Sequence, residues 1–285
     1  MQSIGRFGGR DCAVSLRVMT NARAVPVLFL HGLWLHASSW QPWSDLFAAR
    51  GFEPIAPGWP GEPGTVEHAR RRPEAVAGAG IDDLTGHYAG IVRGLPSAPV
   101  IVGHSFGGLI TQKLLGMGLG RAGVAIDPAP IKGVRPLPFA QLRSGFPVLA
   151  NPGNRRRAVS LTASHFRYAF GNAIGRAESD ALFARWTIPS PGRPLFEAAL
   201  ANVTRRSPAA VDTGNTDRGP LLLISGQRDH TVPDVVTRAT YKLYGDSTAV
   251  TDLKQFPDRG HSLTIDSGWR AVADHTLAWL SRQLT

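Results

Sequence analysis

The chain has 285 residues, of which 43% are hydrophobic and 18% are charged. This balance is typical of globular proteins and excludes wholesale disorder, and the length fits one large domain or two small ones. The single cysteine, Cys12, excludes an intramolecular disulfide framework and a cysteine-rich zinc site. No apolar run approaches the roughly 18 residues of a membrane span, and residues 1–14 lack the apolar core of a signal peptide. We therefore expect a cytoplasmic protein without a membrane span, with secretion left open.

The chain is basic, and the charge is uneven. Lys and Arg number 31 and Asp and Glu number 21, so the net charge is +10, and residues 129–219 hold 13 of the basic and 5 of the acidic residues. No helix-turn-helix, zinc-finger or RNP-like pattern accompanies the charge, so nucleic acid is not an expected partner. Two interpretations stay open: a compositional preference for Arg, or an anionic substrate or surface that faces residues 129–219.

Short apolar runs alternate with stretches of helical periodicity. We predict strands at residues 13–19, 25–30, 52–56, 99–102, 123–126, 221–224 and 252–256. We predict helices at residues 39–49, 81–95, 105–117, 233–243 and 267–283, and an irregular, polar stretch at residues 61–80. Strands that alternate with helices of about ten residues or more indicate βαβ units. The fold class is therefore α/β, with a mainly parallel sheet flanked by helices.

The alternation breaks between the strands predicted at residues 123–126 and 221–224. Residues 129–219 show little strand signal and contain many Pro and Arg residues. The stretch is too long for a loop within a compact domain. We therefore predict an inserted, mostly helical cap at residues 129–219, and a core formed by residues 1–128 and 220–285.

The sequence GHSFG at residues 103–107 joins a predicted strand to a predicted helix. The pattern G-x-S-x-G in this context is typical of a nucleophile elbow, and an ordinary glycine-rich turn is the alternative. The sharp turn strains the middle residue, and small neighbours let the chain segments pass closely. We expect the Ser105 hydroxyl to project above the sheet. The amide of Phe106 should lie at the helix N-terminus, where backbone N–H groups lack a helical partner.

A serine hydroxyl becomes an effective nucleophile when a base removes its proton, and the pKa of histidine suits this task. Of the nine histidines, His261 is the candidate, because it lies in a loop just after the last predicted strand and follows Gly260. His275 lies on the apolar side of the last predicted helix and is expected to be a packing residue.

A carboxylate should orient the imidazole. Asp229, a few residues after the strand at 221–224, is the leading candidate. Asp127, just after an earlier strand, and Asp258, three residues before the base, remain alternatives. For Asp229 itself, a role as the N-cap of the next helix is the competing interpretation.

An acyl-transfer site also needs two donors for the developing oxyanion. Phe106 N–H would supply one, and Leu33 N–H, in the loop after the strand at 25–30, would supply the other. His31 is expected to orient that loop. As substrate-pocket residues we name Trp34, His104, Phe166 and Tyr168, with burial in the core as the alternative for the aromatic side chains.

Four motifs in this order, HG at 31–32, GHSFGG at 103–108, GQRDHTVP at 226–233 and GHS at 260–262, make the chain resemble the capped serine hydrolases of the α/β-hydrolase fold. The resemblance covers nearly the whole chain and matches the order Ser105, Asp229, His261. It implies an esterase- or lipase-like enzyme that forms an acyl-enzyme without a metal or organic cofactor. Serine at the nucleophile position speaks against haloalkane dehalogenases and epoxide hydrolases, which have Asp there.

The same resemblance does not specify the substrate. We expect a small-molecule ester with a neutral, small to medium apolar acyl group. A C–C bond hydrolase, a lyase or a cofactor-free haloperoxidase with the same triad is the enzymatic alternative, and a triad-retaining binding protein is the non-enzymatic one.

Overall fold

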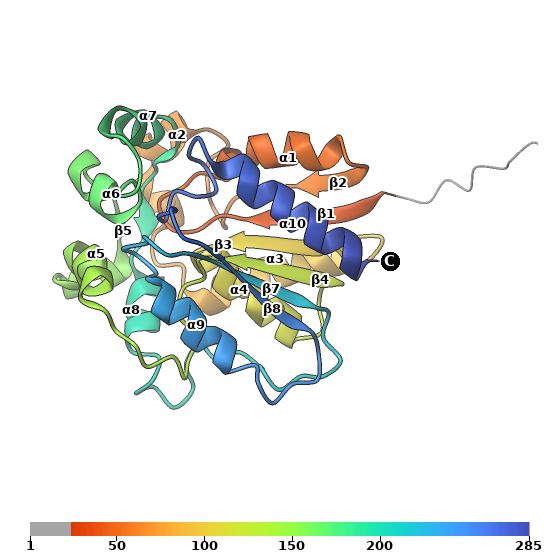
Figure 1. Cartoon of the computed structure of the whole chain (residues 1–285). Coiled ribbons are helices and arrows are strands. Elements are labelled where there is room, and N and C mark those ends of the chain that lie inside the picture. The colour runs from red at the N-terminus through yellow and green to blue at the C-terminus, as the bar shows by residue number, and fades with distance from the viewer. Residues whose placement is uncertain (1–23, 285) are drawn as a thin grey trace, which may run out of the picture.

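The computed structural model describes residues 24–284 (Figure 1), so Cys12 and the strand predicted at residues 13–19 lie outside the described residues. Its centre is a sheet of six parallel strands in the order β2-β1-β3-β4-β7-β8. The strands are β1 (Val25–Leu30), β2 (Phe52–Ile55), β3 (Val100–His104), β4 (Ala122–Ile126), β7 (Leu221–Gly226) and β8 (Thr251–Phe256). The predicted strands in this part of the chain are confirmed, with ends that differ by at most two residues.

Helices cover both faces of the sheet, which confirms the predicted fold class (Figure 1). One face packs against α1 (Gln41–Ala48) and α10 (Trp269–Gln283), and the other against α3 (Ile81–Gly94), α4 (Phe106–Gly116) and α9 (Asp234–Lys242). Successive side chains of a strand point to opposite faces, so Leu28 and Leu30 join one apolar cluster and Val27 and Phe29 the other. No helix within residues 24–284 is long and apolar enough to cross a membrane.

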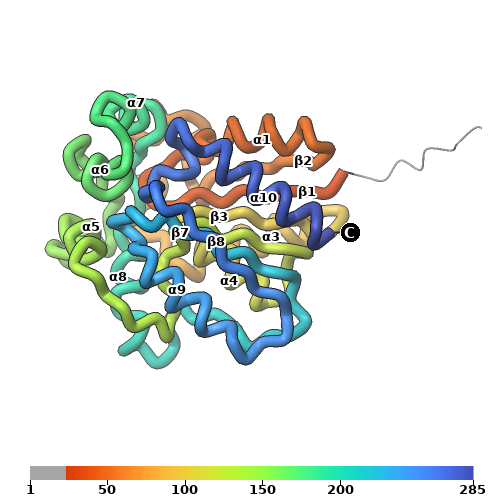
Figure 2. Tube along the Cα trace, in the orientation of Figure 1, coloured from red at the N-terminus to blue at the C-terminus, as the bar shows by residue number. Residues whose placement is uncertain are grey.

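Residues 129–219 form α5 (Phe139–Leu149), α6 (Ala163–Ala169), α7 (Arg176–Trp186), α8 (Arg193–Ala199), the 3-10 helix η3 (Pro152–Arg156) and the short antiparallel strands β5 (Ala158–Val159) and β6 (Ser190–Pro191). Helices α5, α6 and α7 gather at one end of the molecule, beyond the carboxyl ends of the strands (Figures 1 and 2). Their buried side chains, such as Val148 and Phe166, belong to the same apolar cluster as Leu30 and Leu109. The segment and the sheet therefore share one continuous interior.

The prediction of an irregular stretch at residues 61–80 is wrong. These residues include α2 (Val66–Arg71) and the 3-10 helix η2 (Pro73–Val76). The Thr65 hydroxyl caps the first turn of α2. The Arg70 guanidinium donates to the carbonyl oxygens of Thr187 at 2.9 Å and Ala184 at 2.8 Å, at the end of α7. These tertiary hydrogen bonds stabilise a helix too short to show an apolar stripe in the sequence.

An aromatic group occupies the centre of the face beneath α1. The ring of Phe29 lies 5.1 Å from that of Trp40, 6.3 Å from that of Trp43 and 5.2 Å from that of Phe47, all fully or almost fully buried. Aromatic pairs at these separations stabilise a core beyond their area burial alone. Phe29 therefore anchors α1 and the 3-10 helix η1 (Ala37–Trp40) to the middle of the sheet.

We predict that Phe29→Ala lowers the free energy of unfolding by about 3–5 kcal/mol, because the surrounding rings cannot fill the cavity. Urea denaturation followed by tryptophan fluorescence measures the change. Val250→Ala, at an exposed position, is the control and should stay within about 0.5 kcal/mol of wild type. A similarly small change for Phe29→Ala would contradict this account of the core.

Candidate active site

Ser105 occupies the sharp turn between β3 and α4. Its φ of 55° and ψ of −120° are strained for a residue with a side chain. Its amide donates to the carbonyl oxygen of Ile126 at 2.9 Å, which fixes the turn against β4. A Cβ at Gly103 would overlap the carbonyl of Gly107, and a Cβ at Gly107 would overlap the carbonyl of Leu30. The turn therefore requires glycine on both sides and presents Ser105 at the carboxyl end of the sheet.

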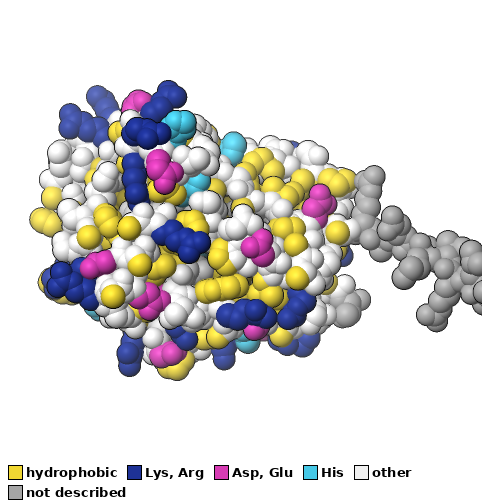
Figure 3. Space-filling model, turned by 90° about the horizontal axis from the view of Figure 1, so that it is seen from above, with side chains coloured by type: hydrophobic (Ala, Val, Ile, Leu, Met, Phe, Trp, Pro, Cys, Tyr) yellow, Lys and Arg dark blue, Asp and Glu magenta, His cyan; other side chains and the backbone are white. Residues whose placement is uncertain are grey.

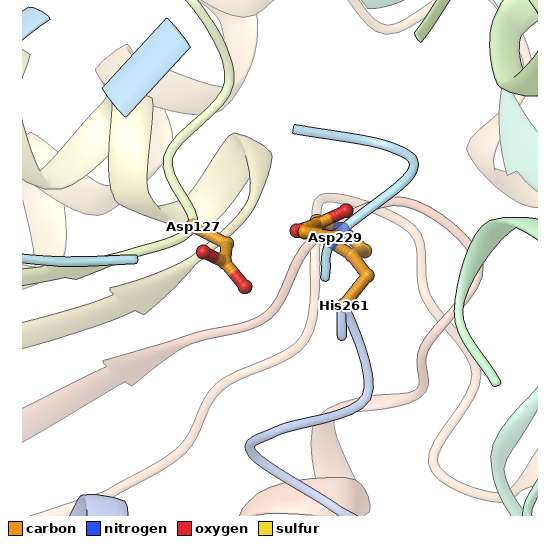
Figure 4. A group of neighbouring side chains, drawn as sticks. All are labelled: Asp127, Asp229 and His261. Atoms are coloured by element: carbon orange, nitrogen blue, oxygen red, sulfur yellow. The ribbon is translucent and has the colours of Figure 1, made fainter. Parts of the chain in front are cut away.

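Asp229 and His261 form a buried pair at the ends of the neighbouring strands β7 and β8 (Figure 4). Oδ2 of Asp229 lies 2.5 Å from Nδ1 of His261. Oδ1 of Asp229 accepts hydrogen bonds from the amides of Thr231 at 2.6 Å and Val232 at 2.8 Å. The N-cap of α9 is Pro233, so Asp229 does not cap that helix. The amides of Thr231 and Val232 hold the Asp229 side chain in place, and Asp229 in this position contacts the imidazole of His261.

His261 and Ser105 are not hydrogen-bonded to each other. Nε2 of His261 has no hydrogen-bond partner among the described residues. The His261 ring lies 4.5 Å from the ring of His104, the chain neighbour of Ser105. Catalytic hydrogen bonds are often long before substrate binds. The structure thus brings the candidate base and the candidate acid together, and Nε2 of the candidate base has no partner among the described residues.

Asp127, the alternative acid, lies fully buried beside this pair (Figure 4). Its Oδ1 accepts a hydrogen bond from the amide of Gly226 at 2.7 Å, and its Oδ2 has no partner within residues 24–284. Burial first, and then the negative charge of Asp229, raises the pKa of Asp127 well above its ordinary value. Burial therefore favours the neutral form of Asp127, and Asp229 is the residue of the two that contacts His261.

Two further features of the geometry concern this pair. Side-chain atoms of Asp127, Asp229 and His261 lie within 4.8 Å of one another, and Asp229 and His261 also form a hydrogen bond with each other. Asp258, the third candidate acid, has a side chain that is 62% exposed and pairs with Arg259 at 3.6 Å. Its exposure separates Asp258 from the buried site.

The loop at residues 31–34 runs beside Ser105. A Cβ at Gly32 would come within 2.6 Å of the Ser105 Cβ, so only glycine allows this approach. Leu33, whose amide is the expected second oxyanion donor, follows directly, and Phe106, the expected first donor, begins α4 on the other side of Ser105. Both side chains are buried.

Trp34 connects this loop to the segment at residues 129–219. Its φ is 66°, which is unusual for a bulky side chain. Its amide donates to the Ser190 hydroxyl at 2.6 Å, and its carbonyl accepts from the amide of Ile188 at 3.0 Å. These two hydrogen bonds stabilise the strained backbone of Trp34 against the stretch that joins α7 to α8.

Glu62 supports the loop from below and was not identified from the sequence. Its Oε2 lies 3.0 Å from Nε2 of His31, and its Oε1 accepts a hydrogen bond from the amide of Ala37 at 3.0 Å. Burial alone would raise the pKa of Glu62, but His31 and these hydrogen bonds outweigh it and lower the pKa. The His31 ring also stacks on Trp59 at 5.2 Å. Glu62 lies in the stretch at residues 61–80, and no pattern in that stretch related it to His31.

A cavity of about 200 Å³ opens at Ser105. Trp34 and Phe106 lie on its wall, as does a set of mostly apolar residues that sequence analysis did not identify: Ile131, Val134, Leu142, Leu149, Leu195, Ala198, Thr231 and Val232. Most of them come from the segment at residues 129–219. The apolar character of most of them is visible in the sequence, but only the tertiary packing brings them to Ser105.

The other three residues expected at the pocket, His104, Phe166 and Tyr168, do not line this cavity. Phe166 is buried and stacks on Phe170 at 4.9 Å. Tyr168 lines a separate hollow of about 350 Å³, where the Arg143 guanidinium lies 4.1 Å from its ring. His104 is buried, and this burial lowers its pKa well below the ordinary value. These three residues lie outside the lining of this cavity, and a role for them in substrate binding stays a prediction.

We predict that the raised pKa of Asp127 makes stability depend on pH. The native state binds more protons than the unfolded state between the ordinary pKa of 3.8 and the raised one. Stability from the neutral carboxyl is therefore complete below that range and falls by about 1.4 kcal/mol per pH unit within it. Asp127→Asn stays neutral and should gain stability relative to wild type as the pH rises above about 4.

Urea denaturation at a series of pH values measures this difference. The ionisable neighbours Asp229, Asp234 and His261 are present in both the variant and wild type. Asp258→Asn, at an exposed carboxylate, is the matched control and should follow the wild-type profile. Parallel profiles for Asp127→Asn and wild type would show that Asp127 is ionised in the native state.

The structure was compared with solved structures, and three similar ones are a methylesterase, MES16, from Arabidopsis, a monoacylglycerol lipase from Paleococcus ferrophilus and a thermophilic esterase from Thermogutta terrifontis. Their identities with this chain are 15%, 18% and 19%, and their TM-scores are 0.62, 0.62 and 0.61. The alignments cover 90%, 90% and 92% of this chain and 99%, 94% and 91% of the respective structures. At these identities the likeness establishes the fold.

No curated protein matches the sequence. The family described as "Alpha/beta hydrolase family" matches residues 27–275, which include the elbow at Ser105, the Asp229–His261 pair and nearly all of the sheet. This match spans far more than half of the chain and agrees with the observed order of the strands and helices. The chain belongs to the alpha/beta hydrolase family.

Proposed function

We propose that this hydrolase is a serine carboxylesterase. The observation that carries the proposal is the buried hydrogen bond between Asp229 and His261, placed at the carboxyl ends of adjacent strands beside the strained Ser105. In this arrangement His261 removes the proton of the Ser105 hydroxyl as it attacks the ester carbonyl, and then donates it to the leaving alcohol. Asp229 holds the imidazole in the required tautomer and stabilises its positive charge.

The tetrahedral intermediate carries an oxyanion, and we assign its donors to the amides of Leu33 and Phe106. Gly32 packs against Ser105 and brings the first of these close, while Phe106 begins α4. The alcohol leaves, and water activated by His261 then hydrolyses the acyl-enzyme. Every step uses side chains and backbone amides of this chain.

The cavity at Ser105 suggests the acyl group. Its volume of about 200 Å³ lies below the range of about 300–1,000 Å³ that holds drug-sized ligands. Its wall is mostly apolar, and its one charged side chain, Arg135, is exposed. We therefore propose a neutral ester with a small to medium apolar acyl group. Residues 129–219 would act as the cap, because this segment supplies most of the residues on the wall.

We predict that the protein hydrolyses chromogenic acyl esters, with kcat/KM highest for short to medium chains. A serine-directed organophosphorus inhibitor should abolish this activity and add its mass to Ser105. Ser105→Ala should remain folded, lose roughly 10⁴- to 10⁶-fold in kcat and escape labelling. Activity that persists in the folded variant would exclude Ser105 as the nucleophile.

The same panel separates the alternatives. A matched neutral and anionic ester, assayed at low and high ionic strength, should respond equally to salt if the charge of residues 129–219 plays no part in turnover. Robust turnover of β-diketones or cyanohydrins without ester hydrolysis would favour a C–C hydrolase or a lyase. Tight binding without turnover of any compound would favour a receptor.

We predict that Asp229→Asn lowers kcat on the order of 10⁴-fold, because the imidazole loses the carboxylate that orients it. Asp127→Asn should cost far less, since the asparagine replaces a carboxyl that is already neutral. Thermal unfolding of both variants checks that they fold. If Asp127→Asn proves the more damaging of the two, the acid belongs at the end of β4 rather than β7.

A further inference from the structure

An exposed apolar stripe follows helix α5. Phe139, Leu142 and Phe146 are 76%, 45% and 66% exposed, and their spacing of three and four residues places them on one side of the helix. Leu137, 63% exposed, immediately precedes the helix. Large apolar side chains that are exposed together mark a surface that contacts another apolar phase.

A second exposed apolar pair lies just after the end of helix α8. Leu200 and Val203 are 47% and 81% exposed. The Asn202 side chain between them accepts from the amide of Gly133 and donates to the carbonyl of Val134, both at 2.7 Å. These hydrogen bonds fix the end of α8 beside the chain that leads into α5.

We name the six side chains Leu137, Phe139, Leu142, Phe146, Leu200 and Val203 the apolar rim. They are six of the ten large hydrophobic side chains that are exposed within the described residues. Leu137 and Leu142 also line the cavity at Ser105, and so do Ala199 and Ala201, which flank Leu200. The apolar surface is therefore continuous with the wall of the proposed acyl pocket.

The charge within the two stretches that form the rim has a single sign. Arg135 and Arg143 are exposed on the α5 side, and Arg205 and Arg206 are exposed just after Val203. Neither stretch, residues 129–150 or residues 199–211, contains an acidic residue. The view from above in Figure 3 shows both basic and acidic side chains at the end of the molecule that carries α5, α6 and α7. An occupant of the rim thus has to combine apolar and anionic chemistry.

We propose that the apolar rim docks onto an anionic lipid surface. Such a surface offers acyl chains to the exposed Phe139 and Phe146 and negatively charged headgroups to the arginines. A second copy of the chain fits less well, because it would bring two cationic rims together. Docking would place the cavity mouth at the lipid, where an apolar ester is concentrated. That last consequence rests on the proposed esterase function, whereas docking itself does not.

Vesicle flotation tests the proposal without any assay of activity. The protein should float with vesicles of phosphatidylcholine and phosphatidylglycerol, and at least several-fold less with phosphatidylcholine alone or at high salt. Phe139→Ser/Phe146→Ser, which removes two rim side chains outside the cavity wall, should abolish flotation. Met117→Ser, at another exposed apolar position, should float like wild type.

A second pair of variants tests whether docking requires the positive charge. Arg205→Glu/Arg206→Glu should lose most of the binding to anionic vesicles, whereas Arg50→Glu, an exposed arginine between α1 and β2, should keep it. All four variants should hydrolyse a short soluble ester like wild type, so a failure of docking and a failure of the esterase proposal are distinguishable. Absence of flotation with anionic vesicles, equal flotation of the double phenylalanine variant, or a rim-dependent dimer in place of vesicle binding would overturn the proposal.

Discussion

The backbone strain at Ser105 is the constraint on which the rest of the site depends. A side chain at φ of 55° and ψ of −120° costs of order 1–3 kcal/mol and persists only where the surroundings enforce it. At Ser105 two close contacts enforce this strained conformation. Gly107 lies against the carbonyl of Leu30, and Gly32 lies against the Ser105 Cβ. The register of β3 between β1 and β4 therefore determines both the position of Ser105 and the path of the loop proposed to hold the oxyanion.

Buried ionisable groups surround this turn, and the protein manages them in different ways. Asp229 forms a hydrogen bond with His261 and accepts two more from backbone amides. Burial and the neighbouring Asp229 raise the pKa of Asp127 and favour its neutral form, and burial lowers the pKa of His104 and favours its neutral form. Glu62 keeps its charge because it faces His31. The result is one buried carboxylate beside the proposed base, with no second negative charge to compete for its proton.

Much of the fold was predictable because its signals are local. The apolar runs that end at Leu30 and Ile224 are buried on both faces of a parallel sheet, and such strands show in the sequence as continuous hydrophobic stretches. Ser105, Asp229 and His261 were identified because each follows a strand, and parallel strands end at one edge. Their positions after parallel strands place all three residues at the same edge of the sheet.

The pocket was not predictable, because its walls depend on packing between distant parts of the chain. Leu142 and Leu195 reach the same cavity from α5 and α8, and no periodicity in the sequence relates the two helices. Phe166 and Tyr168 are aromatic residues of the same segment, yet they pack away from Ser105. Composition identifies residues that can line a pocket, but only the tertiary contacts choose among them.

The hydrogen bonds of Trp34 couple the segment at residues 129–219 to the loop that we propose to hold the oxyanion. Ser190 and Ile188 bind the amide and the carbonyl of the same strained residue, one position after Leu33. Moving the stretch between α7 and α8 away from the sheet has to break both hydrogen bonds and release the strain at Trp34. The backbone beside Ser105 then relaxes in the same motion. Widening the cavity at this place would thus also disturb the backbone that we propose to bind the oxyanion.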